Sequence, residues 1–152
     1  MLHRLDRKLC HFENDITATV IYAVTEPPFD TVLICTAGHP APLLARTGQP
    51  VAHEAEIPPD LLLGVDPERQ RRSHELLLEP GTVLVFYTDG LVERADPITT
   101  GLDGRIKRLN LVRRAFQSGQ DAETICSRII ATGLGDESVA DDVAVIAVCR
   151  TG

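Results

Sequence analysis

The sequence contains no tryptophan, and only four phenylalanines and two tyrosines among its 152 residues. Proteins that hold single-stranded nucleic acid stack the bases on aromatic side chains, and this chain has too few rings to form such a platform. Basic residues are also few: 22 acidic residues outnumber 15 lysines and arginines and give a net charge of −7. A molecule of that charge repels nucleic-acid phosphates and anionic membranes. We therefore expect no nucleic-acid partner and no membrane partner.

The four cysteines, Cys10, Cys35, Cys126 and Cys149, are scattered and include no CxxC pair. This spacing indicates neither a zinc site nor a disulfide framework. Three of the four sit among apolar residues, so we expect those three to be small buried hydrophobic residues in a reducing compartment. Long apolar runs are also missing, and the first residues carry a charge every few positions, which excludes a signal peptide and a membrane span. The sequence thus predicts a soluble, cytoplasmic protein.

The overall composition, 43% hydrophobic and 24% charged, is typical of a globular protein. The length predicts a single domain that occupies residues 1–152. Basic residues gather in two stretches, 69–72 and 105–114, which we expect to be solvated faces and not anion sites.

Periodicity predicts the order of the elements. Apolar residues at helical spacing predict an opening helix over residues 2–12 and two later helices over 106–116 and 122–132, with Asp121 as the N-cap of the last one. Alternating or β-branched runs bounded by proline and glycine predict strands at residues 16–25, 31–37, 42–46, from 51 onward, 73–78, 82–88 and 143–148. Short turns between the early strands favour an antiparallel meander, and the grouped helices favour an α+β fold in which helices cover sheet faces.

The stretch VLVFYTDGLVE places Asp89 at the end of the most apolar strand. Asp-Gly between apolar runs is a strong hairpin signal, so a turn is one interpretation. A metal site is the other, because Asp141 and Asp142 immediately precede the last apolar strand. If the two strands are antiparallel neighbours, the three carboxylates meet at one sheet edge, where they could hold Mg²⁺ or Mn²⁺. Taken alone, each aspartate favours a turn or a solvated loop, and only their joint placement favours the metal site.

Other polar residues give weaker indications. His39 lies between a glycine and a proline, where we expect a surface turn. Ser73, His74 and Glu75 are adjacent on a strand, so their side chains alternate between faces and cannot form a catalytic triad.

Four ordered motifs together resemble a known family: TAGHPAPLLAR (36–46), LLLGV (61–65), LEPGTVLVFYTDGLVERAD (78–96) and ADDVAVIAV (140–148). They are similar to bacterial metal-dependent serine/threonine phosphatases of the PPM or type 2C class, in the branch of stage II sporulation protein E and stress regulator U. The resemblance implies an antiparallel β-sandwich flanked by helices, with a binuclear Mn²⁺ or Mg²⁺ centre that activates water for direct attack on phosphorus.

Matched motif to motif, the resemblance implies that Asp89 and Asp141 are metal ligands. Asp142 would lie behind them and orient a water or a neighbouring ligand. The implied substrate is a phosphorylated regulatory protein of the anti-sigma-factor antagonist type.

The chain also departs from the family pattern. Family members carry, before this portion, an Asp-containing segment and a Gly-His-Gly that contribute to the metal site, and neither is present here. We therefore expect an amino-terminally truncated domain: a fragment, a shortened inactive member, or a chain completed by association through an exposed sheet edge or as a homodimer. Two rival interpretations remain open, namely a catalytically inactive regulatory or protein-binding module of the same fold, and a plain α+β domain without a site.

Overall fold

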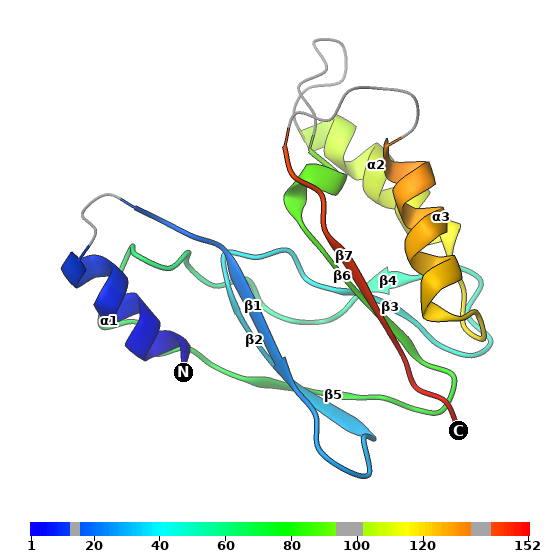
Figure 1. Cartoon of the computed structure of the whole chain (residues 1–152), viewed down its shortest axis with the longest axis horizontal. Coiled ribbons are helices and arrows are strands. Elements are labelled where there is room, and N and C mark those ends of the chain that lie inside the picture. The colour runs from blue at the N-terminus through cyan, green and yellow to red at the C-terminus, as the bar shows by residue number, and fades with distance from the viewer. Residues whose placement is uncertain (13–15, 94–101, 135–140) are drawn as a thin grey trace. The chain divides into compact units, whose positions relative to one another are not determined.

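The computed structural model describes residues 1–12, 16–93, 102–134 and 141–152 (Figure 1). The chain forms two compact units. The first unit contains Met1–Ala41 and Glu56–Leu78, and the second contains Pro42–Ala55 and Glu79–Gly152.

The first unit consists of helix α1 (Leu2–Phe12) and a three-stranded sheet. The strands β1 (Val20–Val24), β2 (Thr31–Ala37) and β5 (His74–Leu77) lie in the order β1-β2-β5 and are antiparallel. The apolar core of this unit gathers buried side chains from the helix, the sheet and the segment before β5: Leu2, Cys35, Ala37 and Leu63.

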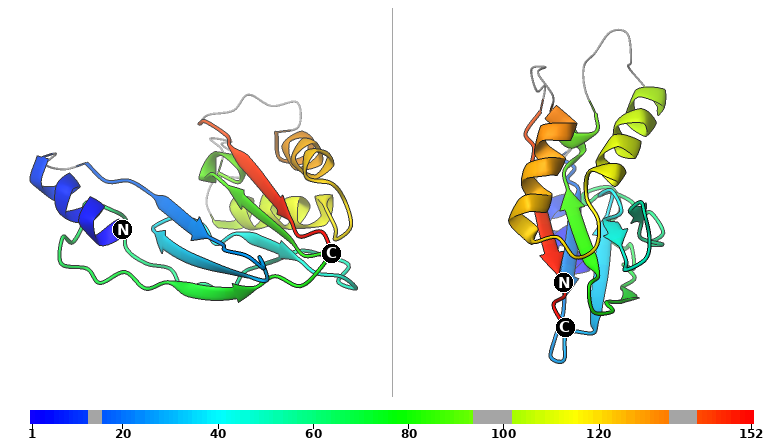
Figure 2. Two further views of the ribbon diagram at one scale, coloured as in Figure 1. Left: turned by 60° about the horizontal axis from the view of Figure 1, so that its bottom comes forward. Right: turned by 90° about the vertical axis from the view of Figure 1, so that its right-hand side faces the viewer.

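The second unit has a four-stranded antiparallel sheet in the order β4-β3-β6-β7. Its strands are β3 (Leu43–Ala45), β4 (His53–Glu54), β6 (Val83–Tyr87) and β7 (Val145–Cys149). A 3₁₀ helix, η1 (Asp89–Leu91), follows β6, and α2 (Leu102–Ala115) and α3 (Ala122–Leu134) lie beside the sheet (Figure 2). The helices contribute Val112, Ile125 and Ile129 to a core that also holds Phe116, just after α2, and Val83 and Val85 of β6.

The predicted α+β class, with antiparallel sheets and helices packed on a sheet, is confirmed. The cap of α3 is also as predicted, because Asp121 accepts hydrogen bonds from the backbone N–H of Thr124 at 2.8 Å and from its hydroxyl at 2.6 Å. Those hydrogen bonds hold the pKa of the Asp121 carboxyl below its ordinary value.

Two details of the predicted strands are wrong. The meander is interrupted, since β5 pairs with β2 and β6 pairs with β3, each across a long connection. The strand predicted at 16–25 is shorter, because Ala18 exchanges backbone hydrogen bonds with Leu63 at 2.9 and 3.2 Å and does not continue the pairing of β1 with β2. Both differences come from contacts between distant segments, which local periodicity does not encode.

The four cysteines form no disulfide bond with one another. All four thiols are free, but only Cys35 is fully buried, so the expectation of buried hydrophobic cysteines holds for that residue alone. Burial raises the pKa of the Cys35 and Cys149 thiols.

Within the described ranges, no helix is long and apolar enough to cross a membrane.

The two basic stretches are not simply solvated, which corrects the prediction. The Arg71 side chain is only 3% exposed and forms an ion pair with the fully buried Asp6. In the second stretch, Arg113 donates from Nε to the carbonyl of Ala52 at 2.7 Å. These guanidinium groups satisfy backbone and carboxylate acceptors inside the fold, whereas Arg72 and Arg114 are exposed.

Candidate metal centre at the ends of β6 and β7

The apolar strands β6 and β7 are antiparallel neighbours, paired from Val83 with Cys149 to Tyr87 with Val145. The β-branched and aromatic residues of β6 suit a buried strand, and four of its five residues are buried. Because the pairing ends at Tyr87, the residues that follow β6 and those that precede β7 meet at one edge of the sheet (Figure 1). The adjacency on which the predicted site depends is therefore present.

Thr88 ties the two strand ends together. Its backbone N–H donates to the carbonyl of Ala144 at 3.1 Å, and its hydroxyl donates to the carbonyl of Asp142 at 3.1 Å and accepts from the N–H of Ala144 at 2.9 Å. Three hydrogen bonds, one to Asp142 and two to Ala144, thus fix the backbone before β7 relative to the end of β6.

Asp89 begins the 3₁₀ helix η1 and does not form a hairpin turn. Its carbonyl accepts from Val92 N–H at 2.8 Å and Glu93 N–H at 2.7 Å, and its Oδ1 accepts from Gly90 N–H at 3.1 Å. The next strand that pairs with β6 is β7, far along the chain. The hairpin interpretation of Asp-Gly is therefore wrong, and buried Leu91 and Val92 anchor the helical turn in the core.

Gly90 is required by close packing at this edge. A Cβ atom placed on it would lie 2.6 Å from the carbonyl oxygen of Asp142 and 3.2 Å from that of Asp141. Any side chain would push the two acidic backbone segments apart. The glycine of the Asp-Gly pair therefore permits the approach of Asp141 and Asp142 to η1.

Exposure to solvent increases sharply from Tyr87 to Asp89. Burial, and after it the nearby Glu54 carboxylate, raises the pKa of Tyr87 to about 12. Two residues later, Asp89 is partly exposed, and Asp141 and Asp142 are exposed. The carboxylates thus stand at the solvent boundary of a rigid, apolar sheet, which is a suitable support for a binding site.

The sequence profile of the family Stage II sporulation protein E (SpoIIE) matches residues 1–151. The chain belongs to this family. A comparison with curated protein sequences found no match.

Solved structures show that this SpoIIE-family chain shares its fold with known proteins. The RsbU and RsbW domains of Rv1364c from Mycobacterium tuberculosis have 25% sequence identity and a TM-score of 0.76, with 99% of this chain and 41% of that chain covered. The phosphatase domain of SpoIIE from Bacillus subtilis, presoaked with Mn, has 14% identity and a TM-score of 0.65, with coverage of 89% and 57%. The PPM Ser-Thr phosphatase MsPP from Mycobacterium smegmatis has 17% identity and a TM-score of 0.64, with coverage of 97% and 70%.

These similarities identify the fold as that of PPM-type serine/threonine phosphatases. The chain spans 41% and 57% of the first two structures. The descriptions of two related structures, the presoaked SpoIIE domain and RsbX in complex with magnesium, name a divalent metal.

The carboxylates of this SpoIIE-family chain are chemically suited to such an ion. Asp141 Oδ1 accepts from Asp142 N–H at 2.8 Å, and the second carboxylate oxygens of Asp89 and Asp141 have no hydrogen bond to any described residue. No lysine or arginine of the described ranges pairs with the three aspartates. Oxygen donors with open lone pairs are the ligands that Mg²⁺ and Mn²⁺ prefer.

The donor set is nevertheless incomplete. The part of the chain that the structure describes contains no group of three or more His, Cys, Asp or Glu side chains arranged to hold a metal ion. The residues that are present thus fit part of a coordination sphere, and the metal-binding roles of Asp89, Asp141 and Asp142 stay predictions.

Two further sequence predictions concern histidines. His39 is partly exposed, and its Nδ1 lies 3.3 Å from the hydroxyl of Thr19. Ser73, His74 and Glu75 lie at and beside the start of β5, where His74 is partly buried between two exposed neighbours. This alternation agrees with the prediction that the three do not form a triad.

The buried ion pair of Asp6 with Arg71 was not predicted. Asp6 Oδ2 accepts from Arg71 Nε at 2.9 Å and from Nη2 at 2.7 Å, and Asp6 Oδ1 accepts from Gly64 N–H at 3.0 Å. One signal was available in the sequence, because Asp6 occurs on the same helical face as Leu2 and Leu9.

Proposed function

We propose that this chain is part of a metal-dependent serine/threonine phosphatase domain that hydrolyses phosphoserine or phosphothreonine on a regulatory protein. The observation that supports this most directly is the close approach of the backbone of Asp141 and Asp142 to η1, which begins at Asp89; Thr88 ties these segments together and Gly90 permits their approach. Membership of the SpoIIE family agrees with it.

The proposed roles follow from the positions of the carboxylates. Asp89, held at the start of η1, and Asp141, held by its bond to Asp142 N–H, each offer an oxygen to Mn²⁺ or Mg²⁺. Asp142 orients a water or a neighbouring ligand. When bound, the divalent ions activate water and offset charge that develops on the phosphoryl oxygens.

The proposed substrate is a phosphorylated regulatory protein in the cytoplasm, of the anti-sigma-factor antagonist type. Its support is the similarity to a structure that contains RsbU and RsbW domains and to the SiaA-PP2C domain of Pseudomonas aeruginosa. Because the chain spans less than two thirds of those structures, we propose that the active unit contains further strands and carboxylates supplied by a longer chain or a second one.

The test is Mn²⁺-dependent hydrolysis of p-nitrophenyl phosphate and of a phosphoserine protein, by this chain and by a version extended upstream in its reading frame. We expect activity in the extended version, loss of that activity in Asp89→Asn, and no loss in the control Glu75→Gln, which changes an exposed carboxylate of β5. Full activity in extended Asp89→Asn would contradict the assigned site. A folded extended version without any turnover would favour the alternative function, a protein-binding module of the same fold.

A further inference from the structure

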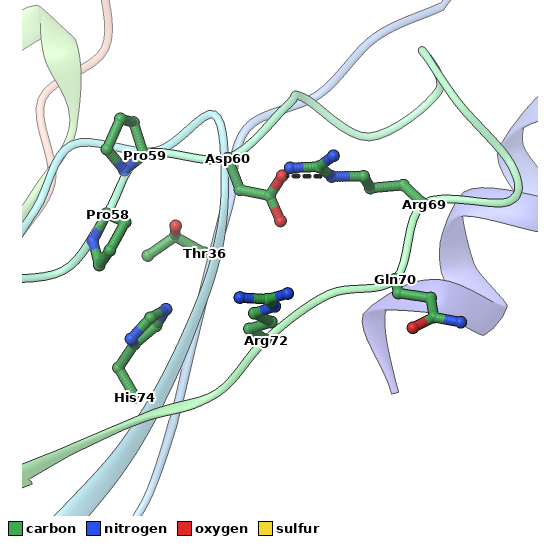
Figure 3. Close-up of a pocket in the computed structure, with 8 residues that line it drawn as sticks. All are labelled: Thr36, Pro58, Pro59, Asp60, Arg69, Gln70, Arg72 and His74. Carbon is green, nitrogen blue, oxygen red and sulfur yellow. Dashed lines mark hydrogen bonds and ion pairs between the residues drawn. The ribbon is translucent and has the colours of Figure 1, made fainter.

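A pocket of about 420 Å³ lies in the first unit, and its residues are separate from the three aspartates of the candidate metal centre. Figure 3 shows the eight side chains that line it, from β2, from the segment 58–72 and from the start of β5. This volume is within the range of small-ligand sites.

The strand register explains why three hydrogen-bond donors converge in this pocket. Ile34 of β2 pairs with His74, so Arg72, two residues before His74, falls opposite Thr36, two residues after Ile34. Side chains two residues apart on an extended strand share a face. Accordingly, the Thr36 hydroxyl, the Arg72 guanidinium and the His74 imidazole border the same space (Figure 3).

The acidic residue of the pocket is already neutralised. Asp60 Oδ1 accepts from Arg69 Nε and from Leu61 N–H, each at 2.8 Å, and Asp60 Oδ2 lies 3.4 Å from Arg71 Nη1. Burial alone would favour the neutral acid, but these donors hold the pKa of the Asp60 carboxyl below its ordinary value. The Asp60 charge therefore needs no external cation.

Arg72 differs from the two arginines beside it. Arg69 is paired with Asp60, and Arg71 is paired with Asp6 and also donates to the carbonyls of Leu61 and Leu62. Among the described residues, the Arg72 side chain has neither an ion pair nor a hydrogen bond. Counting Asp6 and Asp60 against Arg69, Arg71 and Arg72 leaves one positive charge, in a chain whose net charge is −7.

From these contacts we propose that the pocket binds the phosphate of a phosphomonoester, with Arg72, His74 and Thr36 as its donors. A phosphomonoester has three terminal oxygens, which matches three donors from three residues better than the two oxygens of a carboxylate do. One arginine guanidinium can donate two parallel hydrogen bonds to two oxygens of a phosphate. Pro58 and Pro59 also line the pocket and offer an apolar wall to the body of the ester (Figure 3).

The test is calorimetric titration of the full chain with O-phosphoserine, inorganic phosphate and acetate, in the presence of EDTA so that the candidate metal centre does not contribute. We expect O-phosphoserine to bind, and acetate to bind more weakly. Arg72→Gln should weaken phosphoserine binding by about tenfold or more, because it removes a charge-assisted pair of hydrogen bonds. His74→Gln should weaken it less.

Arg114→Gln is the matched control, since it removes the same charge from another exposed arginine, on α2. Phosphoserine bound more tightly than phosphate would identify an esterified ligand, and equal affinities would identify free phosphate; both support a phosphate site. The proposal is overturned if no phosphate compound binds, if folded Arg72→Gln binds like the wild type, or if Arg114→Gln loses as much affinity. Because the test excludes metal and turnover, its failure is distinguishable from failure of the phosphatase proposal.

Discussion

The two units use acidic residues in opposite ways. In the first unit, Asp6 is fully buried and receives donors from Arg71 and Gly64. In the second unit, Asp89, Asp141 and Asp142 lie at the end of the strand pair β6 and β7, with no cationic partner among the described residues. The two environments contain the same residue type and differ in whether its carboxylate has a cationic partner.

The physical consequence differs accordingly. A buried charge whose partner is removed is strongly unfavourable, so the pair of Asp6 with Arg71 holds α1 to the segment before β5. Unpaired carboxylates at a solvent boundary contribute little to folding, and their mutual repulsion is relieved when a cation binds. We infer that the first arrangement serves the fold and the second serves the proposed chemistry.

The largest effect should come from Asp6→Asn. It removes the carboxylate that receives two of the Arg71 nitrogens and leaves this guanidinium, only 3% exposed, with the more distant Asp60 carboxylate, so the free energy of unfolding should fall by about 3–5 kcal/mol. Urea unfolding followed by circular dichroism measures the loss. Arg72→Gln, at the exposed neighbouring position, is the control and should change the stability by less than about 0.5 kcal/mol. If Asp6→Asn were as stable as the wild type, the inference that the Asp6 carboxylate serves the fold would be wrong.

A smaller loss should follow Gly90→Ala in the second unit. The added Cβ would lie 2.6 Å from the Asp142 carbonyl oxygen, so the backbone must shift, at a cost of roughly 1–3 kcal/mol in the free energy of unfolding. Gly152→Ala, where nothing lies within 4 Å of the new Cβ, is the control. Chemical shifts of Asp141 and Asp142 in nuclear magnetic resonance spectra should change in Gly90→Ala only. Unchanged shifts and stability would show that the close approach at this edge is not required.

Asp60→Asn tests an intermediate case, a carboxylate 14% exposed and paired with an arginine that is 46% exposed. We expect a loss of about 1 kcal/mol or less at neutral pH. Because the folded pKa of Asp60 is lowered, its stabilisation is present above the unfolded value of 3.8 and is lost as the pH falls through the folded value. Urea unfolding at stepwise lower pH should therefore show the gap between variant and wild type closing in acid. A gap that stays constant would disprove the role of the Asp60 charge.

Local sequence was sufficient to predict much of the second unit. The apolar runs at residues 82–88 and 143–148 predicted the strands β6 and β7. The acidic residues at their ends predicted one shared edge on the condition that the two strands pair, and they do pair. The Asp121 cap was predictable because capping depends on residues within one helical turn.

Features that depend on distant contacts could not be predicted in the same way. Asp89-Gly90 has the local signature of a hairpin, and only the pairing of β6 with β7 directs the chain into η1. The pairing of β5 with β2 and the ion pair of Asp6 with Arg71, 65 residues apart, likewise have no local signature. The pocket beside Arg72 arises from that same strand pairing, so its donors were not grouped from the sequence.

The most direct test of the contrast between the units is Mn²⁺ binding, followed by electron paramagnetic resonance, to the wild-type chain, to Asp89→Asn and to Asp141→Asn. We expect each variant to bind Mn²⁺ about tenfold or more weakly than the wild type, because a charged ligand is lost, while its stability stays within about 0.5 kcal/mol. Asp66→Asn, at an aspartate of the first unit, should bind like the wild type. Variants that bind Mn²⁺ as tightly as the wild type, or a wild-type chain that binds none, would contradict the account.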